Sequence, residues 1–373
     1  MKKVFTVLLV LCLSLTLFAQ GAQEATAKAE AAYSIAMITD SGDITDQSFN
    51  QSTYEACKDY AAAKGLNFKY YKPTGDSDTD RSASIEKAID EGFNIIVMPG
   101  YLFGPSIAAV APEYPDVKFV ALDVSEGDVG GAISNVYCMV YQEEIAGYLA
   151  GYATVSLGYT NLGFCGGMAV PAVIRYGYGF VQGADAAAAK LGKTGTIQYT
   201  YANQFFGDAD ITAAMDTMYA NGAEVVFACG GGVYNSVAEA AAKVGKKVVG
   251  VDVDQKATID GAYGAGLTLT SAMKGLYAST QAALKTIVED GAWNTVAGTF
   301  ATLGLVSGTD VDSNFVGIPT GSGTEWSDSF TLADYTALVN DVFTGKLTIS
   351  NDTTVKAADN AKVLTVKDLG NIK

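Results

Sequence analysis

The sequence predicts an α/β protein of two lobes, each built on a parallel β-sheet with helices on both faces. Three observations lead to this expectation. Short runs rich in β-branched residues alternate with stretches of helical length. These runs are apolar at nearly every position, as in parallel sheets that are covered on both sides. The alternation occurs in two sets, one before and one after about residue 140, and 373 residues are enough for two doubly wound lobes.

The elements follow from this alternation in order along the chain. The predicted strands are the apolar runs at 34–39, 94–99, 118–123, 161–166, 224–228 and 247–252. The predicted helices lie between them at 51–64, 81–91, 142–156, 173–191, 211–221 and 236–244. The chain after residue 299 is less regular and richer in Thr, Gly, Ser and Asp, so we interpret it as crossover strands and a closing subdomain. No internal sequence repeat is evident.

The N-terminus has the layout of a secretory signal. Lys2 and Lys3 precede a mostly apolar run that ends at Phe18, and small residues follow it. This run is too short to span a membrane as a helix. We therefore predict a signal segment at 1–22, a linker at 23–32, and an exported protein that is periplasmic or associated with the cell envelope. A lipid anchor is not supported, because no cysteine follows the small residues.

Composition excludes several classes of function. The chain contains no histidine, which excludes Ser-His-Asp triads, Cys-His nucleophile pairs and His-ligated metals. With 24 Lys and Arg against 40 Asp and Glu, the formal net charge is −16, whereas nucleic-acid binding needs a basic surface. The cysteines are widely spaced, so we interpret them as buried thiols. No phosphate-binding glycine motif occurs. We expect no metal, no cofactor and no nucleic-acid partner.

Polar and glycine residues follow several predicted strands. The stretch Asp40–Asn50 (DSGDITDQSFN) comes directly after the first strand, where a parallel sheet presents its binding loop. Asp252 and Asp254 end another strand, and their spacing sends both side chains to the same side. The glycines from Gly230 permit either a close ligand or a tight turn. The aspartates at 76–80 lack the Gly and Glu of a calcium loop. Taken alone, the first stretch is explained equally well by helix N-caps.

Five stretches in order carry a family resemblance: Asp40–Asn50, Glu143–Tyr152 (EEIAGYLAGY), Gly166–Ala184 (GGMAVPAVIRYGYGFVQGA), Gly250–Gln255 (GVDVDQ) and Leu269–Lys274 (LTSAMK). The chain resembles, over roughly residues 33 to 305, the basic membrane protein (BMP) family of ABC-transporter substrate-binding proteins, which includes purine-nucleoside-binding receptors. The resemblance implies a type I periplasmic-binding-protein fold, with two doubly wound three-layer lobes joined by a multi-strand hinge.

The same resemblance implies how the chain divides. We predict an N-terminal lobe of residues 33–140 plus about 266–305, and a C-terminal lobe of residues 141–265 plus about 306–373. We expect the hinge near Tyr137–Gln142 and at two later crossovers, so that the lobes close around the ligand.

In the nucleoside-binding branch of the family, two aromatic rings from opposite lobes hold the base between them. Phe49, in the DQSFN block, matches the first ring. Phe206 is our candidate for the second ring, and Phe205 stays open as the alternative, because the surrounding loop differs in length from that of family members.

The resemblance also implies the polar contacts. Asp40 and Asp123 match positions near the edge of the base, and Asp252 and Lys274 match a pair that holds the ribose. Gly231 matches a position that contributes backbone atoms to the binding site. The full set of candidate ligand-binding residues is Asp40, Ser41, Phe49, Asn50, Asp123, Phe206, Gly231, Asp252 and Lys274. Ser41 stands where an asparagine is common in that branch.

The function implied is that of an exported receptor that captures a nucleoside, with a purine favoured, and delivers it to ABC-transporter permease subunits in the membrane. The carboxylates of the candidate site should repel phosphate, which favours nucleosides over nucleotides. Three alternatives remain: a sugar or autoinducer-type ligand in the same cleft, a surface adhesin or signalling receptor, and a hydrolase that uses the aspartates. We rank the enzyme last, because nothing nearby supplies a nucleophile or a metal.

Overall fold

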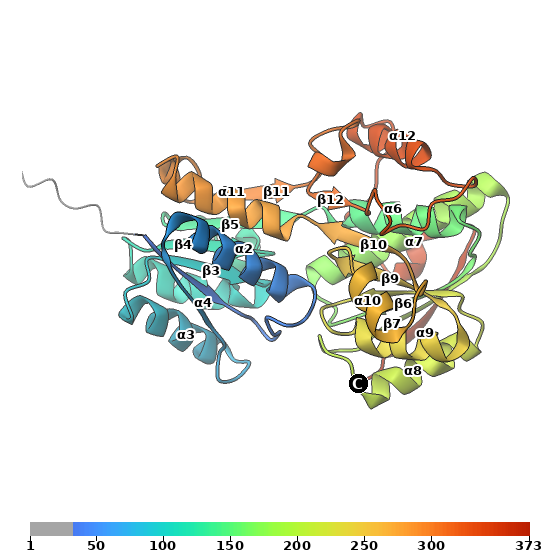
Figure 1. Ribbon diagram of the computed structural model, residues 1–373, viewed down its shortest axis with the longest axis horizontal. Helices are drawn as coiled ribbons and strands as arrows, with labels where there is room; N and C mark the ends of the chain where they lie inside the picture. Colours follow the sequence, from blue (N-terminus) through green and yellow to red (C-terminus); the bar gives the residue numbers. More distant parts are fainter. Residues whose placement is uncertain (1–32) are drawn as a thin grey trace, which may run out of the picture. The chain divides into compact units, whose positions relative to one another are not determined.

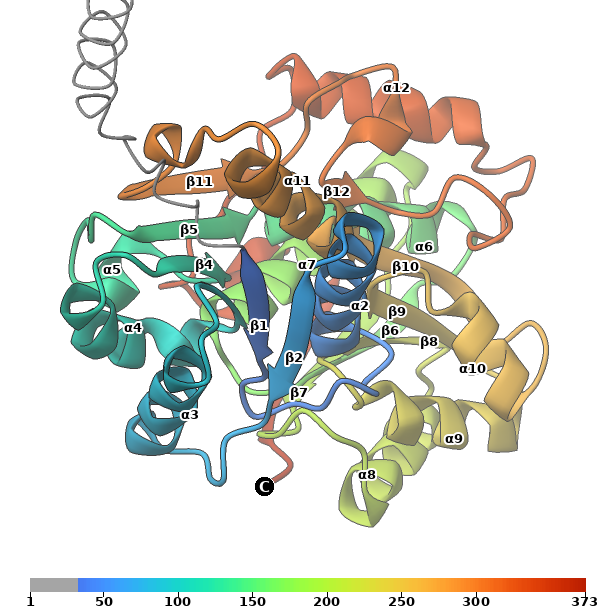
Figure 2. The same ribbon diagram turned by 60° about the vertical axis from the view of Figure 1, so that its left-hand side comes forward.

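The computed structural model describes Tyr33–Lys373, and the signal and linker segments predicted at 1–32 lie outside these residues. The described chain forms two β-sheets, and each has helices on both faces (Figure 1, Figure 2). Every strand and helix predicted above is present, with ends shifted by no more than about three residues. Within 33–373, no helix has an apolar stretch long enough to cross a membrane.

The first sheet is entirely parallel, in the order β11-β5-β4-β3-β1-β2. Its strands are β1 (Ser34–Ile38), β2 (Asn67–Tyr71), β3 (Ile95–Pro99), β4 (Lys118–Leu122), β5 (Val136–Tyr141) and β11 (Thr299–Leu303). Its helices are α2 (Phe49–Lys64), α3 (Asp78–Asp90), α4 (Gly104–Val110), α5 (Glu126–Val129) and α11 (Leu276–Val288). Alternate residues of β1 are buried on opposite faces. Ile35 and Met37 belong to the core shared with α2 and α11, and Ala36 and Ile38 to the core shared with α3, α4 and α5.

The second sheet has the order β12-β10-β9-β8-β6-β7-β13, and only the β10–β12 pair is antiparallel. Its strands are β6 (Asn161–Gly166), β7 (Thr196–Tyr201), β8 (Val225–Cys229), β9 (Lys247–Asp252), β10 (Thr268–Lys274), β12 (Val316–Gly317) and β13 (Thr365–Asn371). Its helices are α6 (Glu143–Ser156), α7 (Pro171–Leu191), α8 (Ala209–Ala220), α9 (Tyr234–Val244), α10 (Lys256–Tyr263) and α12 (Leu332–Phe343). Helices α6 and α7 cover one face, and α8, α9 and α10 cover the other.

The chain passes between the two sheets three times, and these passages lie together (Figure 1). The first is at Gln142, between β5 and α6. The second is at Gly275, between β10 and α11, and the third follows β11 at Gly304. The passages are hydrogen-bonded to one another: the Gln142 N–H donates to the Leu303 carbonyl at 2.9 Å, and the Gly275 N–H donates to the Phe315 carbonyl at 2.7 Å. A bundle of three such passages is the kind of connection around which two lobes can rotate.

One element lies in a different sheet from the one we expected. We assigned residues from about 266 onward to the N-terminal lobe, but Thr268–Lys274 forms β10 of the second sheet, parallel to β9. The first element to return to the first sheet is α11, which packs against α2. The sequence pattern did not predict this strand, because three of its buried positions carry hydroxyl residues, Thr268, Thr270 and Ser271, and so interrupt the apolar run. The remaining lobe limits stay predictions.

Helices α6 and α7 pack with their backbones nearly touching. A Cβ atom added to Gly179 would lie 2.1 Å from the Glu144 carbonyl oxygen, and one added to Gly151 would lie 2.2 Å from the Phe180 carbonyl oxygen. Real side chains never approach that closely. Glycine is therefore required at these positions, and the start of α7 is fixed against the start of α6.

Candidate functional site

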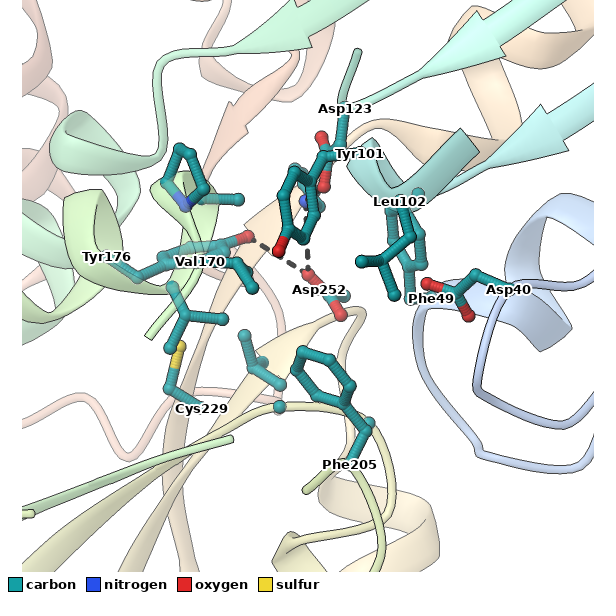
Figure 3. Close-up of a pocket in the computed structure, with 18 of the residues that line it drawn as sticks. Asp40, Phe49, Tyr101, Leu102, Asp123, Val170, Tyr176, Phe205, Cys229 and Asp252 are labelled. Carbon is teal, nitrogen blue, oxygen red and sulfur yellow. Dashed lines mark hydrogen bonds and ion pairs between the residues drawn. The ribbon is translucent and has the colours of Figure 1, made fainter. Parts of the chain in front are cut away.

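A cavity lies where the carboxyl ends of the strands of both sheets meet (Figure 3). This is the edge at which open parallel sheets bind ligands. Seven of the nine residues predicted from the sequence line it: Asp40, Phe49, Asn50, Asp123, Gly231, Asp252 and Lys274. Ser41 and Phe206 do not. Figure 3 shows the rings of Phe49, Tyr101, Tyr176 and Phe205 around the carboxylate of Asp252 in this view.

Of the two phenylalanines considered for the second stacking ring, Phe205 lines the cavity and Phe206 does not. Phe206, our candidate, is 59% exposed and lies outside the lining. The backbone explains the difference, because the Gly232 N–H donates to the Phe205 carbonyl at 2.8 Å and Phe206 bridges Gly232. Neighbouring residues of such an extended segment point to opposite sides. The Phe205 ring also needs the glycine at position 167, where a Cβ would lie 2.5 Å from the ring.

Lys274 ends β10 at the centre of the polar part of the cavity and is 5% exposed. Its Nζ lies 2.5 Å from Asp123 Oδ2, 3.3 Å from Glu143 Oε1 and 3.9 Å from Asp252 Oδ1. The same amine is 4.7 Å from the centre of the Phe49 ring. Burial alone would lower the pKa of Lys274, but the three carboxylates raise it above its ordinary value, so the side chain stays charged.

Asp123 and Asp252 reach Lys274 from opposite lobes. Each has a left-handed backbone, with φ of 59° and 66° respectively, which aspartate tolerates better than most residues. Asp252 Oδ2 accepts from the Ser48 hydroxyl at 2.6 Å, and Oδ1 accepts from the Tyr176 hydroxyl at 3.3 Å. Asp123 Oδ1 is buried and accepts no hydrogen bond from the described residues. Burial raises the pKa of Asp123 to about 7, although Lys274 opposes this shift.

Asp40 and Asn50 form a second polar group at the β1 end of the cavity. Asp40 Oδ1 accepts from the Gly42 N–H at 2.9 Å and from Asn50 Nδ2 at 3.2 Å, and burial raises the pKa of Asp40 above its ordinary value. Asn50 Oδ1 is buried without a donor among the described residues. Together with Asp123 Oδ1, it offers an acceptor to a ligand that carries N–H groups. The Ser41 hydroxyl is also buried without a partner in 33–373, but it lies outside the lining.

Several lining residues were absent from our sequence-based set, among them Tyr101, Arg175 and Tyr176. Tyr101 lies in the short turn Tyr101–Phe103 after β3, and the other two lie in the first turns of α7. The signal that could have found them is topological. Helix α7 follows β6, so its first residues must lie at the same edge as the strand ends already selected.

Behind the cavity, Glu143 joins Lys274 to Arg175. Arg175 Nε donates to Glu143 Oε2 at 2.7 Å and lies 3.9 Å from Glu144 Oε2. Glu143 is fully buried, yet Arg175 and Lys274 hold its pKa below the ordinary value. Glu144 Oε2 is buried without a hydrogen-bond donor in the described chain, and burial raises the pKa of Glu144 to about 7.

We expect Glu144 to make the stability of the protein depend on pH. Its pKa rises from 4.5 to about 7 on folding, so between these values only the unfolded chain has released the proton, and stability falls as pH rises. Glu144→Gln removes this titration. We expect the variant to be more stable than the wild type by about 3 kcal/mol at pH 8 and nearly equal to it at pH 4.5. Urea denaturation at both pH values measures the difference, with the exposed Glu86→Gln as the control. A gain of the same size at both pH values would contradict this assignment.

No group of three or more Cys, Asp or Glu side chains within 33–373 has the arrangement needed to hold a metal ion. The cavity instead combines aromatic faces with carboxylates grouped around one lysine. Such a lining suits a flat ring that carries N–H groups and hydroxyl groups, because the rings cover its faces and the carboxylates accept from its donors.

Comparison with known proteins gave consistent matches. The family model Bmp, described as "ABC transporter substrate-binding protein PnrA-like", matches residues 33–311. The "ABC transporter nucleoside-binding protein BmpA" of Lactococcus lactis subsp. cremoris is 29% identical over 234 residues, which cover 59% of this chain and 64% of that protein. The "CD4+ T-cell-stimulating antigen" of Listeria monocytogenes is 29% identical over 258 residues, covering 65% of this chain and 70% of the antigen. The chain thus matches less than two thirds of the length of the Lactococcus protein.

Among solved structures, a solute-binding protein of an ABC transporter system from Aeropyrum pernix K1 superposes with a TM-score of 0.64. Its sequence is 20% identical, and the superposition covers 86% of this chain and 88% of that one. At this identity the likeness concerns the fold alone. It confirms the predicted α/β fold of the type I periplasmic-binding-protein kind, with two lobes.

Proposed function

This chain belongs to the Bmp family of PnrA-like ABC-transporter substrate-binding proteins, and from this membership we propose that it is an exported receptor for a nucleoside. A purine nucleoside is favoured, and the receptor delivers it to permease subunits in the membrane without a chemical reaction. The observation that carries the proposal is the cavity between the two lobes, which is lined by Phe49, Phe205 and a lysine surrounded by three carboxylates.

The two phenyl rings account for the preference for a flat base. Phe49 comes from the first lobe, at the start of α2, and Phe205 from the loop after β7 of the second lobe. Stacking on an aromatic side chain contributes about 1–3 kcal/mol per base. Because the rings belong to different lobes, both contacts form only when the lobes close, so stacking and closure reinforce each other.

The charged and polar residues account for the recognition of the sugar and for the exclusion of phosphate. The carboxylate of Asp252 can accept from ribose hydroxyls, and Lys274 balances its charge inside the closed cleft. Asp123 Oδ1 and Asn50 Oδ1 can accept from N–H groups of the base. Among the described residues 33–373, the cations of the lining are Lys274 and Arg175, and both are already paired with carboxylates. A phosphate would enter without a free cation to meet it, so nucleotides should bind far more weakly than nucleosides.

Isothermal titration calorimetry of the purified protein tests the proposal. We expect inosine or guanosine to bind with a Kd of about 1 μM or lower, and the corresponding monophosphate to bind at least about 100-fold more weakly. Phe205→Ala and Phe49→Ala should each raise the Kd about tenfold or more, which is the lost stacking contribution. The neighbouring exposed ring provides the control, since Phe206→Ala should leave the Kd unchanged.

Other results would contradict the proposal. Binding of a sugar with no binding of nucleosides would assign the cleft to a different ligand. Failure to bind any small molecule would favour an adhesin or signalling role. Release of free base from a bound nucleoside would identify an enzyme. A larger effect of Phe206→Ala than of Phe205→Ala would restore our original candidate for the second ring.

A further inference from the structure

The two lobes are also joined by hydrogen bonds that lie outside the cavity. Gln47 belongs to the loop between β1 and α2, in the first lobe, and does not line the cavity. Its backbone carbonyl accepts from Gln255 Nε2 at 3.0 Å, and its side-chain Oε1 accepts from the Thr258 hydroxyl at 3.2 Å. Both partners lie at the start of α10, in the second lobe. Gln47 thus bonds across the cleft without facing the ligand space.

The direction of the side-chain bond is fixed from the first lobe. A carboxylate can only accept, so Glu55 Oε1 takes its hydrogen bond from Gln51 Nε2, at 2.8 Å. This turns Gln51 Oε1 toward Gln47, where it accepts from Gln47 Nε2 at 2.6 Å and from the Gln47 N–H at 3.1 Å. The remaining polar atom of the Gln47 side chain, Oε1, is therefore an acceptor directed at the Thr258 hydroxyl.

The backbone bond is fixed from the second lobe in the same way. Gln255 is fully buried, and its Oε1 accepts from the Val251 N–H at 2.9 Å. Its Nε2 is then left to donate to the Gln47 carbonyl. Gln47 itself adopts a left-handed backbone, with φ of 54°, which is uncommon for a residue with a side chain and persists only where surrounding contacts hold it. The loop is shaped so that both acceptors of Gln47 face the second lobe.

We propose that Gln47 is a positioning residue that holds the two lobes closed from outside the ligand cavity. The inference rests on the proposed function, because closure matters to a receptor that traps its ligand. Opening must break both cross-cleft bonds of Gln47 as well as the contacts to the ligand. Gln47 consequently slows ligand release while contributing no contact to ligand recognition.

Stopped-flow measurement of inosine binding to the full-length mature protein tests this role. Thr258→Val removes only the cross-cleft side-chain bond, whereas Gln47→Ala removes that bond together with the bond to Gln51 within the first lobe. Each should speed inosine dissociation about threefold to tenfold, with the association rate changed less than about twofold. The double variant should resemble Gln47→Ala alone, since the two substitutions delete one shared interaction. The control is Thr45→Ala, in the same loop, where the exposed hydroxyl donates only to Asp43 at 3.0 Å.

The outcomes separate this inference from the proposed function. If Gln47→Ala and Thr258→Val release inosine at the rate of Thr45→Ala, the role of Gln47 is refuted and the nucleoside receptor stands. A lowered melting temperature with unchanged dissociation also refutes it, because that pattern belongs to a purely structural residue. If the wild type binds no nucleoside, the proposed function fails, and small-angle X-ray scattering of the free proteins then tests the role of Gln47 in closure. A larger radius of gyration for the double variant than for Thr45→Ala supports that role. Equal radii refute it.

Discussion

Lys274→Met is expected to lower the free energy of unfolding by about 3–5 kcal/mol at pH 8 and to abolish nucleoside binding. The substitution leaves Asp123, Glu143 and Asp252 without the cation that they share at 2.5, 3.3 and 3.9 Å. Removing one partner from a buried ionic cluster costs more than the cluster itself contributes, because the remaining charges stay out of water. Urea denaturation at pH 8 measures the loss, and titration with inosine measures binding.

The loss should shrink as the pH falls. Burial already raises the pKa of Asp123 to about 7 and raises that of Asp252, and removing Lys274 takes away the cation that opposes both shifts. The carboxylates of the variant therefore take up protons on folding at mildly acidic pH, which stabilises the folded variant as pH falls from 8 toward 5. The control is Lys285→Met, in α11, which breaks an ion pair with Asp290 that is largely exposed. It should change stability little at either pH. Equal losses for the two variants would contradict the central position given to Lys274.

Gly179→Ala is expected to destabilise the protein by about 3 kcal/mol and to weaken nucleoside binding as well. The new Cβ would lie 2.1 Å from the backbone oxygen of Glu144, which no side-chain rotation can relieve, so α6 and α7 must move apart. Because Arg175 and Tyr176 lie one turn before this contact, the shift displaces residues that line the cavity. Thermal denaturation and inosine titration measure the two effects.

The matched control for this substitution is another helical glycine. Gly261 lies in α10, and a Cβ atom there would meet nothing within 4 Å. Gly261→Ala should stabilise the protein by up to about 1 kcal/mol, because alanine favours the helix more than glycine does. If Gly179→Ala behaved in the same way, the close backbone contact between α6 and α7 would be refuted.

The sequence was sufficient for six interior strands, β1, β3, β4, β6, β8 and β9, because their buried residues read as continuous apolar runs. It did not predict the interior strands β5 and β7, in which half-buried or polar residues interrupt the apolar run. It was not sufficient for edge strands. Residues of β2 are mostly exposed, and those of β13 almost entirely so, hence neither has an apolar run to reveal it. Strand β10 is central but carries hydroxyl groups, one of which, on Thr270, finds its partner 54 residues away at Thr324. Such a pairing cannot be inferred from the local pattern.

The candidate site divides in the same way. Asp40–Asn50 and Asp252 were indicated by their places after strands, because the topology sends every strand end of a parallel sheet to one edge. Asp123 and Lys274 were identified through the family resemblance instead. Asp123 and Asp252 even follow matching runs, KFVAL and KVVGV, a similarity between the lobes that the sequence did not make evident until both strands were placed. The choice between Phe205 and Phe206 depends on one backbone bond to Gly232. The contact of Glu143 with Arg175 depends on two helices packing together. Neither feature can be predicted from the spacing of residues along the sequence.

The position of Lys274 as the last residue of β10, directly before the passage at Gly275, has a consequence for the resting receptor. When the lobes swing apart, the amine and Glu143 travel together with the second sheet, whereas Asp123 departs with the first. Opening thus separates opposite charges and lets water reach them. Dissolved salt screens the attraction between these charges once water reaches them. In the proposed receptor, a higher ionic strength should therefore favour the open state that admits the ligand.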